Sequence, residues 1–185
     1  AQVGGVALEL MLARGRLLDA RWQLVHATHS DSGEIAAVAR SGAGVVLCPS
    51  TEANLGDGVL DLPGWLAAGV PLAIGSDSQA TRDWREELRL LEYAQRLARR
   101  ARNVAAAPEL GVASTAERLF ARVLQGCAGA AGEPSWGLVA GARADALVVD
   151  PRDDALLGLD PKRSLDSSAS GVTAFTCSST SFLST

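Results

Sequence analysis

The segment VPLAIGSDS (residues 70–78) places an acidic residue, Asp77, just after a short apolar run. A short apolar run bounded by Pro and Gly predicts a buried β-strand. The segment WQLVH (residues 22–26) has the same layout, with the imidazole of His26 after its strand. In a parallel α/β sheet or barrel the carboxyl ends of the strands share one face, and that face carries the chemistry. The two segments therefore predict a site at this face.

Working outward from these segments, strand-like and helix-like stretches alternate. Residues 45–48 form a third strand candidate, stopped by Pro49, and residues 51–58 are expected to be a polar loop. Helices are expected at residues 6–18, 35–40, 63–68 and 83–102, and from Ser114 to about Leu124, where small residues 126–132 end the last one. Asp31, with Glu34 three residues on, is an acidic cap before the helix at 35–40, and Ser114 is a good N-cap for the last helix. This order predicts parallel strands joined by right-handed crossovers.

Composition narrows the class of protein. The hydrophobic content of 48% and charged content of 21% are ordinary for a soluble globular domain. The net charge of −4 gives no sign of a nucleic-acid or membrane surface, so neither is expected as a partner. No apolar run reaches the roughly 18 residues of a membrane span, and no leader is visible. Cys48, Cys127 and Cys177 lack CxxC spacing and are expected to be reduced in a cytoplasmic protein.

Asp77 and His26 are the candidate catalytic residues, and each could instead have a purely structural role. Asp77 could hold a metal and accept a proton from its water, or simply cap the following loop. His26 could be a catalytic imidazole or a hydrogen-bonded, partly buried side chain. Their separation of 77 − 26 = 51 residues spans two β/α units, which predicts two strand ends within reach of one ligand. His29 could form a zinc pair with His26 or supply loop polarity.

Other polar residues near these strands are weaker candidates. Glu52, Asn54 and Asp57 follow the middle strand and could contact a polar substrate or solvate a turn. Arg82 could contact an acidic substrate near Asp77. Ser78 has no histidine base at triad spacing, so serine-nucleophile chemistry is not expected. No substrate-binding residue is assigned.

Three segments resemble the metal-dependent amidohydrolase superfamily: VHATH (residues 25–29), LCPSTEANLGDG (47–58) and IGSDS (74–78). More narrowly, CPSTEANLGDG and REELRLLEYAQRL (85–97) are similar to the formimidoylglutamate deiminases. The pattern GLVAGARAD (137–145) resembles the superfamily's β-sandwich. The resemblance covers roughly residues 5–165.

The resemblance implies an α/β fold, a (β/α)₈ TIM-like barrel plus a small β-sandwich, of which this chain would be the C-terminal portion with about strands six to eight. Residues 1–132 would be partial barrel and 133–166 partial sandwich, including a hairpin over 136–150. The Ser/Thr-rich tail 167–185 is expected to be disordered or non-native, and the start at Ala1 suggests that the true start lies elsewhere.

The implied activity is zinc-dependent deimination of N-formimidoyl-L-glutamate to N-formyl-L-glutamate and ammonia, a step of histidine degradation. By resemblance, Asp77 is a metal ligand that moves the proton of the attacking water. His26, at the sixth strand, orients the group under attack. The resemblance also implies a homodimer for the complete enzyme.

The departures from the family pattern are equally specific. The family site also uses a His-x-His pair and a fifth-strand histidine, and this sequence has only His26 and His29. A complete barrel needs roughly 250 residues. We therefore expect an incomplete chain, weakly active or inactive alone. Two alternatives stay open: a guanine- or cytosine-type aminohydrolase of the same superfamily, and a non-catalytic remnant or binding module.

Overall fold

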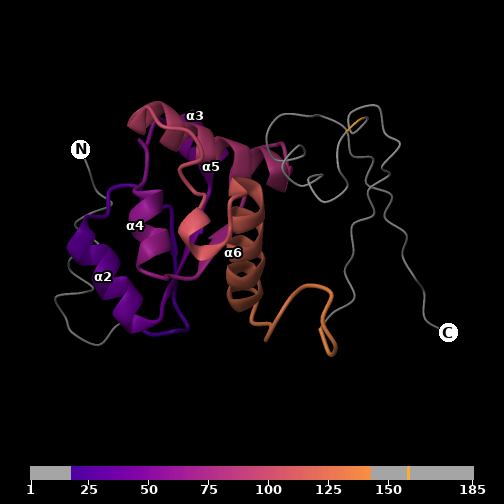
Figure 1. Ribbon diagram of the computed structural model, residues 1–185. Helices are drawn as coiled ribbons and strands as arrows, with labels where there is room; N and C mark the ends of the chain where they lie inside the picture. The colour runs from indigo at the N-terminus through magenta and orange to yellow at the C-terminus, as the bar shows by residue number, and fades with distance from the viewer. Residues whose placement is uncertain (1–17, 143–157, 159–185) are drawn as a thin grey trace.

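The computed structural model describes residues 18–142 and residue 158. Strands and helices alternate through most of this region, and Figure 1 labels helices α2 to α6 along the chain. In chain order the elements are β1 (Gln23–Val25), α2 (Ser32–Ser41), β2 (Gly44–Leu47), α3 (Pro49–Leu55), α4 (Leu62–Ala67), β3 (Leu72–Ile74), α5 (Trp84–Arg99), the 3₁₀ turn η1 (Pro108–Leu110) and α6 (Thr115–Ala130).

The three strands form one parallel sheet in the order β1-β2-β3. The register pairs Leu24 with Val45 and Val45 with Leu72, so the carboxyl ends of all three strands lie at one edge. The backbone ladder continues past β1, because His26 N donates to Val46 O at 2.8 Å. The predicted parallel α/β arrangement is therefore confirmed, with the His26 and Asp77 strands on either side of β2.

Strand β2 is buried because helices cover it and strands flank it. Val45 and Leu47 have no exposed surface, and neither has Leu72 on β3. A near-continuous apolar run is typical of a parallel strand covered on both faces. The same core holds Trp65 of α4 and Leu88 of α5, both essentially buried. The apolar interior thus fixes the sheet from which the strand-end residues project.

Most helices begin where the sequence predicts. Asp31 caps α2 in a capping box, accepting from Glu34 N at 2.8 Å while Glu34 accepts from Asp31 N. Ser114 caps α6 by accepting from Glu117 N at 3.0 Å. Helix α5 ends at Arg99, earlier than predicted, because Arg100 adopts the left-handed conformation.

The predicted polar loop at residues 51–58 is wrong over its first half. Residues Pro49–Leu55 form helix α3, with Pro49 in its first turn and Gly56 as its left-handed C-cap. Polarity suggested a loop, but Thr51 and Glu52 are buried with hydrogen-bond partners of their own. These polar side chains find hydrogen-bond partners in the folded protein, which explains why the segment forms a helix although its composition indicated a loop.

The last helix ends among the small residues 126–132, as predicted. Helix α6 continues to Ala130, and Gly126 lies buried inside it. A Cβ built on Gly126 would lie 1.9 Å from Leu72 O of β3. The glycine is therefore a packing residue that lets the helix backbone approach the strand, rather than a terminator.

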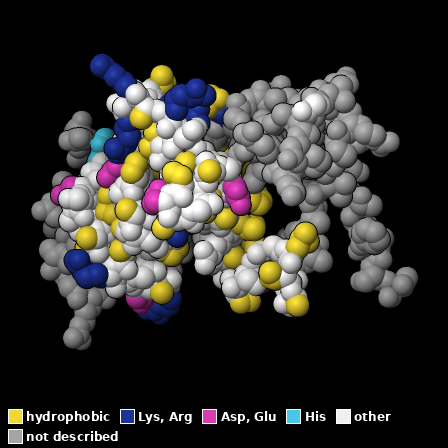
Figure 2. Space-filling model, viewed as in Figure 1, with side chains coloured by type: hydrophobic (Ala, Val, Ile, Leu, Met, Phe, Trp, Pro, Cys, Tyr) yellow, Lys and Arg dark blue, Asp and Glu magenta, His cyan; other side chains and the backbone are white. Residues whose placement is uncertain are grey.

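Several predicted features lie outside the described residues: the helix at 6–17, the tail at 167–185 and Cys177. Of the predicted hairpin, residues 136–142 form turns and bends without a strand, and residues 143–150 are outside the described part. No helix among the described residues is both long and apolar enough to cross a membrane. On the face in Figure 2, acidic and basic side chains are scattered among apolar ones.

Candidate active site

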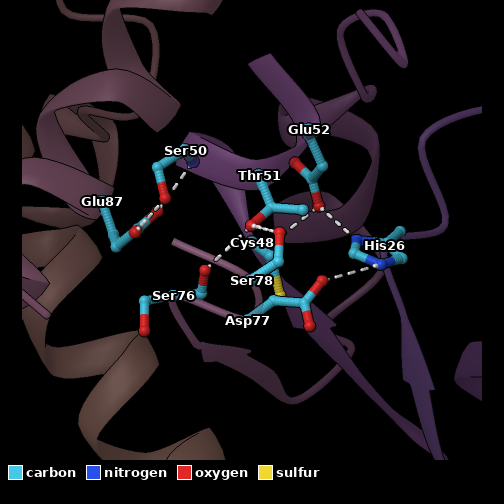
Figure 3. A network of polar contacts seen from close by, with 9 residues as sticks. All are labelled: His26, Cys48, Ser50, Thr51, Glu52, Ser76, Asp77, Ser78 and Glu87. Atoms are coloured by element: carbon cyan, nitrogen blue, oxygen red, sulfur yellow. Dashed lines mark hydrogen bonds and ion pairs between the residues drawn. The ribbon is translucent and has the colours of Figure 1, made fainter. Parts of the chain in front are cut away.

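Three potential metal-ligating side chains meet at the carboxyl edge of the sheet, one after each strand. His26 follows β1, Cys48 follows β2 and Asp77 lies three residues after the end of β3. Figure 3 shows them facing a common point, with Glu52 of α3 beside them. The sequence predicted that His26 and Asp77 would meet, but of Cys48 it predicted only that the thiol is reduced.

His26 lies between two carboxylates. Its Nε2 atom is 3.6 Å from Asp77 Oδ2, and its Nδ1 atom is 3.3 Å from Glu52 Oε1. The His26 side chain is 33% exposed and that of Asp77 46%, so both can be reached from solvent. The imidazole is thus held on one side by a buried acid and presents its other nitrogen to Asp77.

The backbone at the two outer strand ends is unusual. His26 has φ = 71°, Ala27 has φ = 55° and Asp77 has φ = 49°, all in the left-handed region. His and Asp tolerate this region better than most residues, but Ala does not. Strained non-glycine backbone of this kind clusters at functional sites, where it aims side chains. Here it turns His26 and Asp77 toward one another.

Glu52 connects two members of the cluster through one oxygen atom. Its Oε1 accepts a hydrogen bond from Cys48 N at 2.8 Å and also contacts His26 Nδ1. The side chain is only 4% exposed. Burial raises the pKa of Glu52, while the Cys48 amide and His26 oppose that rise. Sequence reasoning placed Glu52 in a loop, although its spacing of four residues from Cys48 was compatible with one helical turn.

Cys48 is a buried thiol surrounded by acids. Burial raises its pKa to about 12, and the charges of Glu52, Asp77 and Glu87 add to the rise. Cys48 and Cys127 are both free among the described residues, as the sequence predicted for a reduced protein. Burial likewise raises the pKa of Cys127 on α6.

The residues present fit a transition-metal ion. One potential ligand atom each from His26, Cys48 and Asp77 lies within 4.8 Å of the others. Imidazole nitrogen, thiolate sulfur and carboxylate oxygen are the three ligand types that zinc uses in proteins. Mg²⁺ and Ca²⁺ prefer oxygen ligands alone. The donor set therefore favours zinc or a metal of similar softness.

A second hydrogen-bond network supports the loop that carries Asp77. Thr51 Oγ1 donates to Ser76 O at 2.8 Å and lies 3.3 Å from Ser78 Oγ. In Figure 3 this network continues the cluster toward Glu87, which accepts from Ser50 N at 2.9 Å. Helix α3 thereby anchors the segment after β3, so Ser78 has a structural contact.

The remaining candidates lie around this cluster rather than in it. Asn54 is exposed on α3, and His29 is exposed three residues beyond His26, outside the metal-ligating group found in the described region. Asp57 follows α3 and is half-buried. Arg82 lines a cavity of about 160 Å³ with Ser76, Asp83, Trp84 and Glu87. Asp77 does not line that cavity, so the predicted contact of Arg82 with a substrate at Asp77 remains a prediction.

A parallel sheet that gathers an imidazole, a thiol and a carboxylate at the carboxyl ends of its strands defines an α/β domain of enzyme type. The chain belongs to the Amidohydrolase family, whose family model matches residues 6–174. Members of this superfamily are generally metal-dependent, and their structures imply a TIM-barrel-like α/β fold.

Individual relatives agree with this membership. The chain is 49% identical to the formimidoylglutamate deiminase of Pseudomonas aeruginosa over 136 residues, 74% of this chain. A crystal structure of an amidohydrolase from Brucella melitensis is 46% identical, with a TM-score of 0.69 over 75% of this chain. An adenosine deaminase from Xanthomonas campestris, crystallised with bound zinc, is 26% identical, with a TM-score of 0.69 over 85% of this chain.

The chain spans about a third of the length of each of these proteins. It covers 30% of the Pseudomonas enzyme, 30% of the Brucella protein and 35% of the Xanthomonas protein.

Proposed function

We propose that this chain carries the part of a deiminase active site that strands six to eight of the barrel contribute, acting on N-formimidoyl-L-glutamate. One observation carries the proposal: His26 Nε2 lies 3.6 Å from Asp77 Oδ2 in a chain 49% identical to a formimidoylglutamate deiminase. Both residues belong to the strand-end segments in which the sequence resembles that family.

The proposed reaction is hydrolytic. The oxygen of water adds to the formimidoyl carbon, the bond from that carbon to its terminal nitrogen breaks, and ammonia leaves. N-formyl-L-glutamate remains. Both protons of the water end on the leaving nitrogen: Asp77 accepts one from the water and then one from the resulting hydroxyl group, and passes each to that nitrogen. His26 faces Asp77 with Nε2 and orients the group under attack, while Glu52 holds the ring from its other side.

Zinc is the proposed metal, and it is supported by the donor set and by the zinc in the Xanthomonas deaminase structure. When bound, zinc supplies electrophilic activation of water at neutral pH. Asp77 would hold it from this part of the fold, together with the histidines that the family contributes from other strands. We also propose that the complete enzyme is a homodimer in the cytoplasm. The free thiols of Cys48 and Cys127 support the cytoplasmic location, since cysteines stay reduced there.

The test is a chimera in which residues 18–142 of this chain replace the matching segment of the Pseudomonas enzyme. We expect ammonia release from N-formimidoyl-L-glutamate in the presence of zinc. Asp77→Asn should lower kcat by about 10²-fold to 10⁴-fold, because it removes the proton acceptor. His29→Gln is the matched control, since His29 is exposed and outside the cluster, and it should retain activity.

A purine aminohydrolase is the second candidate, favoured by the 26% identity to an adenosine deaminase. The same chimera is assayed with adenosine and guanine. A higher kcat/KM for either purine than for N-formimidoyl-L-glutamate would replace the proposed substrate. Full activity of the folded Asp77→Asn chimera would remove Asp77 from the mechanism.

A further inference from the structure

The first turn of α3 lies beside the pair of His26 and Asp77 and places two adjacent polar side chains against it. Thr51 and Glu52 are both buried, although polar and charged side chains are mostly exposed in proteins. Figure 3 shows them reaching in different directions, Thr51 toward the segment that carries Asp77 and Glu52 toward His26. Buried polar groups are fixed by their hydrogen bonds, so these two contacts define what the turn does.

Glu52 determines which nitrogen of the His26 ring carries the hydrogen. Its Oε1 accepts from Cys48 N at 2.8 Å and lies 3.3 Å from His26 Nδ1. A proton on the Glu52 carboxyl group would go to Oε2, because Oε1 already accepts the amide, so Oε1 is an acceptor for the ring in either charge state. The neutral ring therefore donates from Nδ1 and keeps a lone pair on Nε2.

The lone pair on Nε2 is available to a substrate. The distance of 3.6 Å from His26 Nε2 to Asp77 Oδ2 is longer than a protein hydrogen bond, so the two groups face each other without being bonded. The His26 side chain is also 33% exposed, so a ligand can reach it. An acceptor at this position fits an N–H donor, and the formimidoyl group has one on each of its two nitrogens.

Thr51 fixes the backbone from which Asp77 projects. Its Oγ1 donates to Ser76 O at 2.8 Å, and that carbonyl belongs to the peptide unit just before Asp77. Gln79 N donates to the same oxygen at 3.0 Å. Asp77 has φ = 49°, a conformation that persists only where the surrounding structure holds it. Two donors on one carbonyl supply that restraint, and Thr51 is the one that connects it to α3.

Helix α3 is itself fixed at this turn. Glu87 of α5 is buried, and it accepts from Ser50 N at 2.9 Å and from the Ser50 hydroxyl group. Pro49 restricts the backbone one residue earlier. A positioning residue is effective only when packing and hydrogen bonds fix its own place. The start of α3 meets this condition, so it can set the relative positions of two strand ends that β2 separates.

We propose that Thr51 and Glu52 are positioning residues of the active site. Glu52 holds His26 in the tautomer with hydrogen on Nδ1, so that Nε2 accepts an N–H of the formimidoyl group. Thr51 holds the peptide unit before Asp77, so that the carboxylate stays beside the ring and within reach of the attacking water. Neither residue touches the reacting atoms. This inference rests on the proposed function and adds to it how one helical turn aligns the two catalytic side chains.

The first test is ¹⁵N NMR of the histidine rings in the 185-residue chain at about pH 8, where an ordinary histidine is neutral. His26 should carry its hydrogen on Nδ1, whereas the exposed His29 should show the Nε2–H form that predominates in water, and His29→Gln assigns the two rings. Glu52→Gln keeps an accepting oxygen and should keep the Nδ1–H form of His26. Glu52→Leu removes the acceptor and should return His26 to the Nε2–H form. Hydrogen on Nε2 of His26 in the unsubstituted chain would overturn the proposal, as would an Nδ1–H form that survives Glu52→Leu.

The second test measures turnover in the deiminase chimera. Thr51→Val removes the hydroxyl group with little change of shape and should lower kcat about tenfold with KM nearly unchanged, since a displaced catalytic group acts on the transition state. The ratio of kcat in H₂O to kcat in D₂O should rise, because the displaced group is the proton acceptor; a smaller folded fraction would leave that ratio unchanged. Thr51→Ser restores a donor and should restore kcat. Ala53→Ser, at an exposed position of the same helix, is the matched control and should keep both values.

Full kcat and an unchanged isotope ratio in folded Thr51→Val would overturn the role of Thr51, and so would a Thr51→Ser variant as slow as Thr51→Val. The outcomes also separate this proposal from the proposed function. An active chimera with hydrogen on Nε2 of His26 would remove Glu52 as a positioning residue and leave the deiminase proposal standing. Hydrogen on Nδ1, together with a folded chimera inactive on N-formimidoyl-L-glutamate, would retain the action of Glu52 on His26 and remove the substrate.

Discussion

Leu72, at the start of β3, and Asp77, three residues after its end, are close in the sequence but are held in opposite ways. At Leu72 the strand is fully buried, and the backbone of α6 approaches it so closely that Gly126 has no room for a methyl group. At Asp77 the chain is half-exposed, its backbone is left-handed, and its neighbours are His26 and other polar groups. One end is fixed by packing and the other by hydrogen bonds and charge.

The contrast separates two parts of the described region: one contributes mainly to stability, and the other holds the polar groups of the candidate site. Where α6 packs on β3, an added side-chain atom lowers the free energy of unfolding, because the close-packed backbone cannot move aside. The strand-end side holds non-glycine residues in the left-handed region, which costs stability in exchange for aimed side chains. Substitutions at the two ends should therefore differ in sign as well as in size.

The largest expected effect is at the packed end. Gly126→Ala should lower the free energy of unfolding by about 3 kcal/mol, because its new Cβ meets the backbone of Leu72 rather than a flexible side chain. Gly129→Ala is the control: it lies in the same helix with nothing within 4 Å of its added Cβ. Its better helix propensity should raise stability by about 1 kcal/mol. Urea unfolding measures both, and equal effects at the two glycines would contradict the close approach of α6 to β3.

A stabilising change is expected at the strand-end site. Ala27→Gly should raise the free energy of unfolding by about 0.5 kcal/mol, since relief of left-handed strain exceeds the extra freedom of glycine in the unfolded chain. Ala37→Gly in α2 is the matched control and should lower stability by about 1 kcal/mol. Thermal or urea unfolding distinguishes the two signs. A destabilised Ala27→Gly variant would show that strain is not stored there.

The smallest effect concerns pH at the start of α5, next to the site loop. Asp83 caps this helix, and its side-chain hydrogen bond with Arg85 lowers its pKa below the ordinary 3.8. A lowered pKa means that this stabilisation is present above pH 3.8 and is lost as pH falls through the folded-state value. The difference in unfolding free energy between the unsubstituted chain and Asp83→Asn should thus shrink by about 0.5 kcal/mol on acidification. Urea unfolding from about pH 5 to about pH 2 tests it; a constant difference would contradict the lowered pKa.

Much of the local structure was predictable because it rests on local physics. The apolar runs before His26 and Asp77 predicted the two outer strands, and Asp31 with Glu34 predicted the start of α2 through a capping box that forms within one turn. The spacing of 51 residues also predicted that His26 and Asp77 would face one ligand, and they lie 3.6 Å apart.

The predictions of local structure failed where a contact with a residue distant in the sequence determines the structure. Thr51 and Glu52 were expected in a loop, yet partners at Ser76, Cys48 and His26 make them buried residues of a helix. The small residues 126–132 were expected to end a helix, and α6 does end at Ala130, but the contact of Gly126 with β3 inside that helix was not predicted. No local pattern contains either contact.

The sequence by itself therefore determined the alternation of strands and helices, the family, and the pair His26 and Asp77, because periodicity, caps and motifs are properties of neighbouring residues. Only the tertiary structure decided that Cys48 joins this pair and that one buried oxygen of Glu52 holds both Cys48 and His26. The physical reason is that ligand sets and close backbone contacts form between strands, where separation along the chain carries no information about distance.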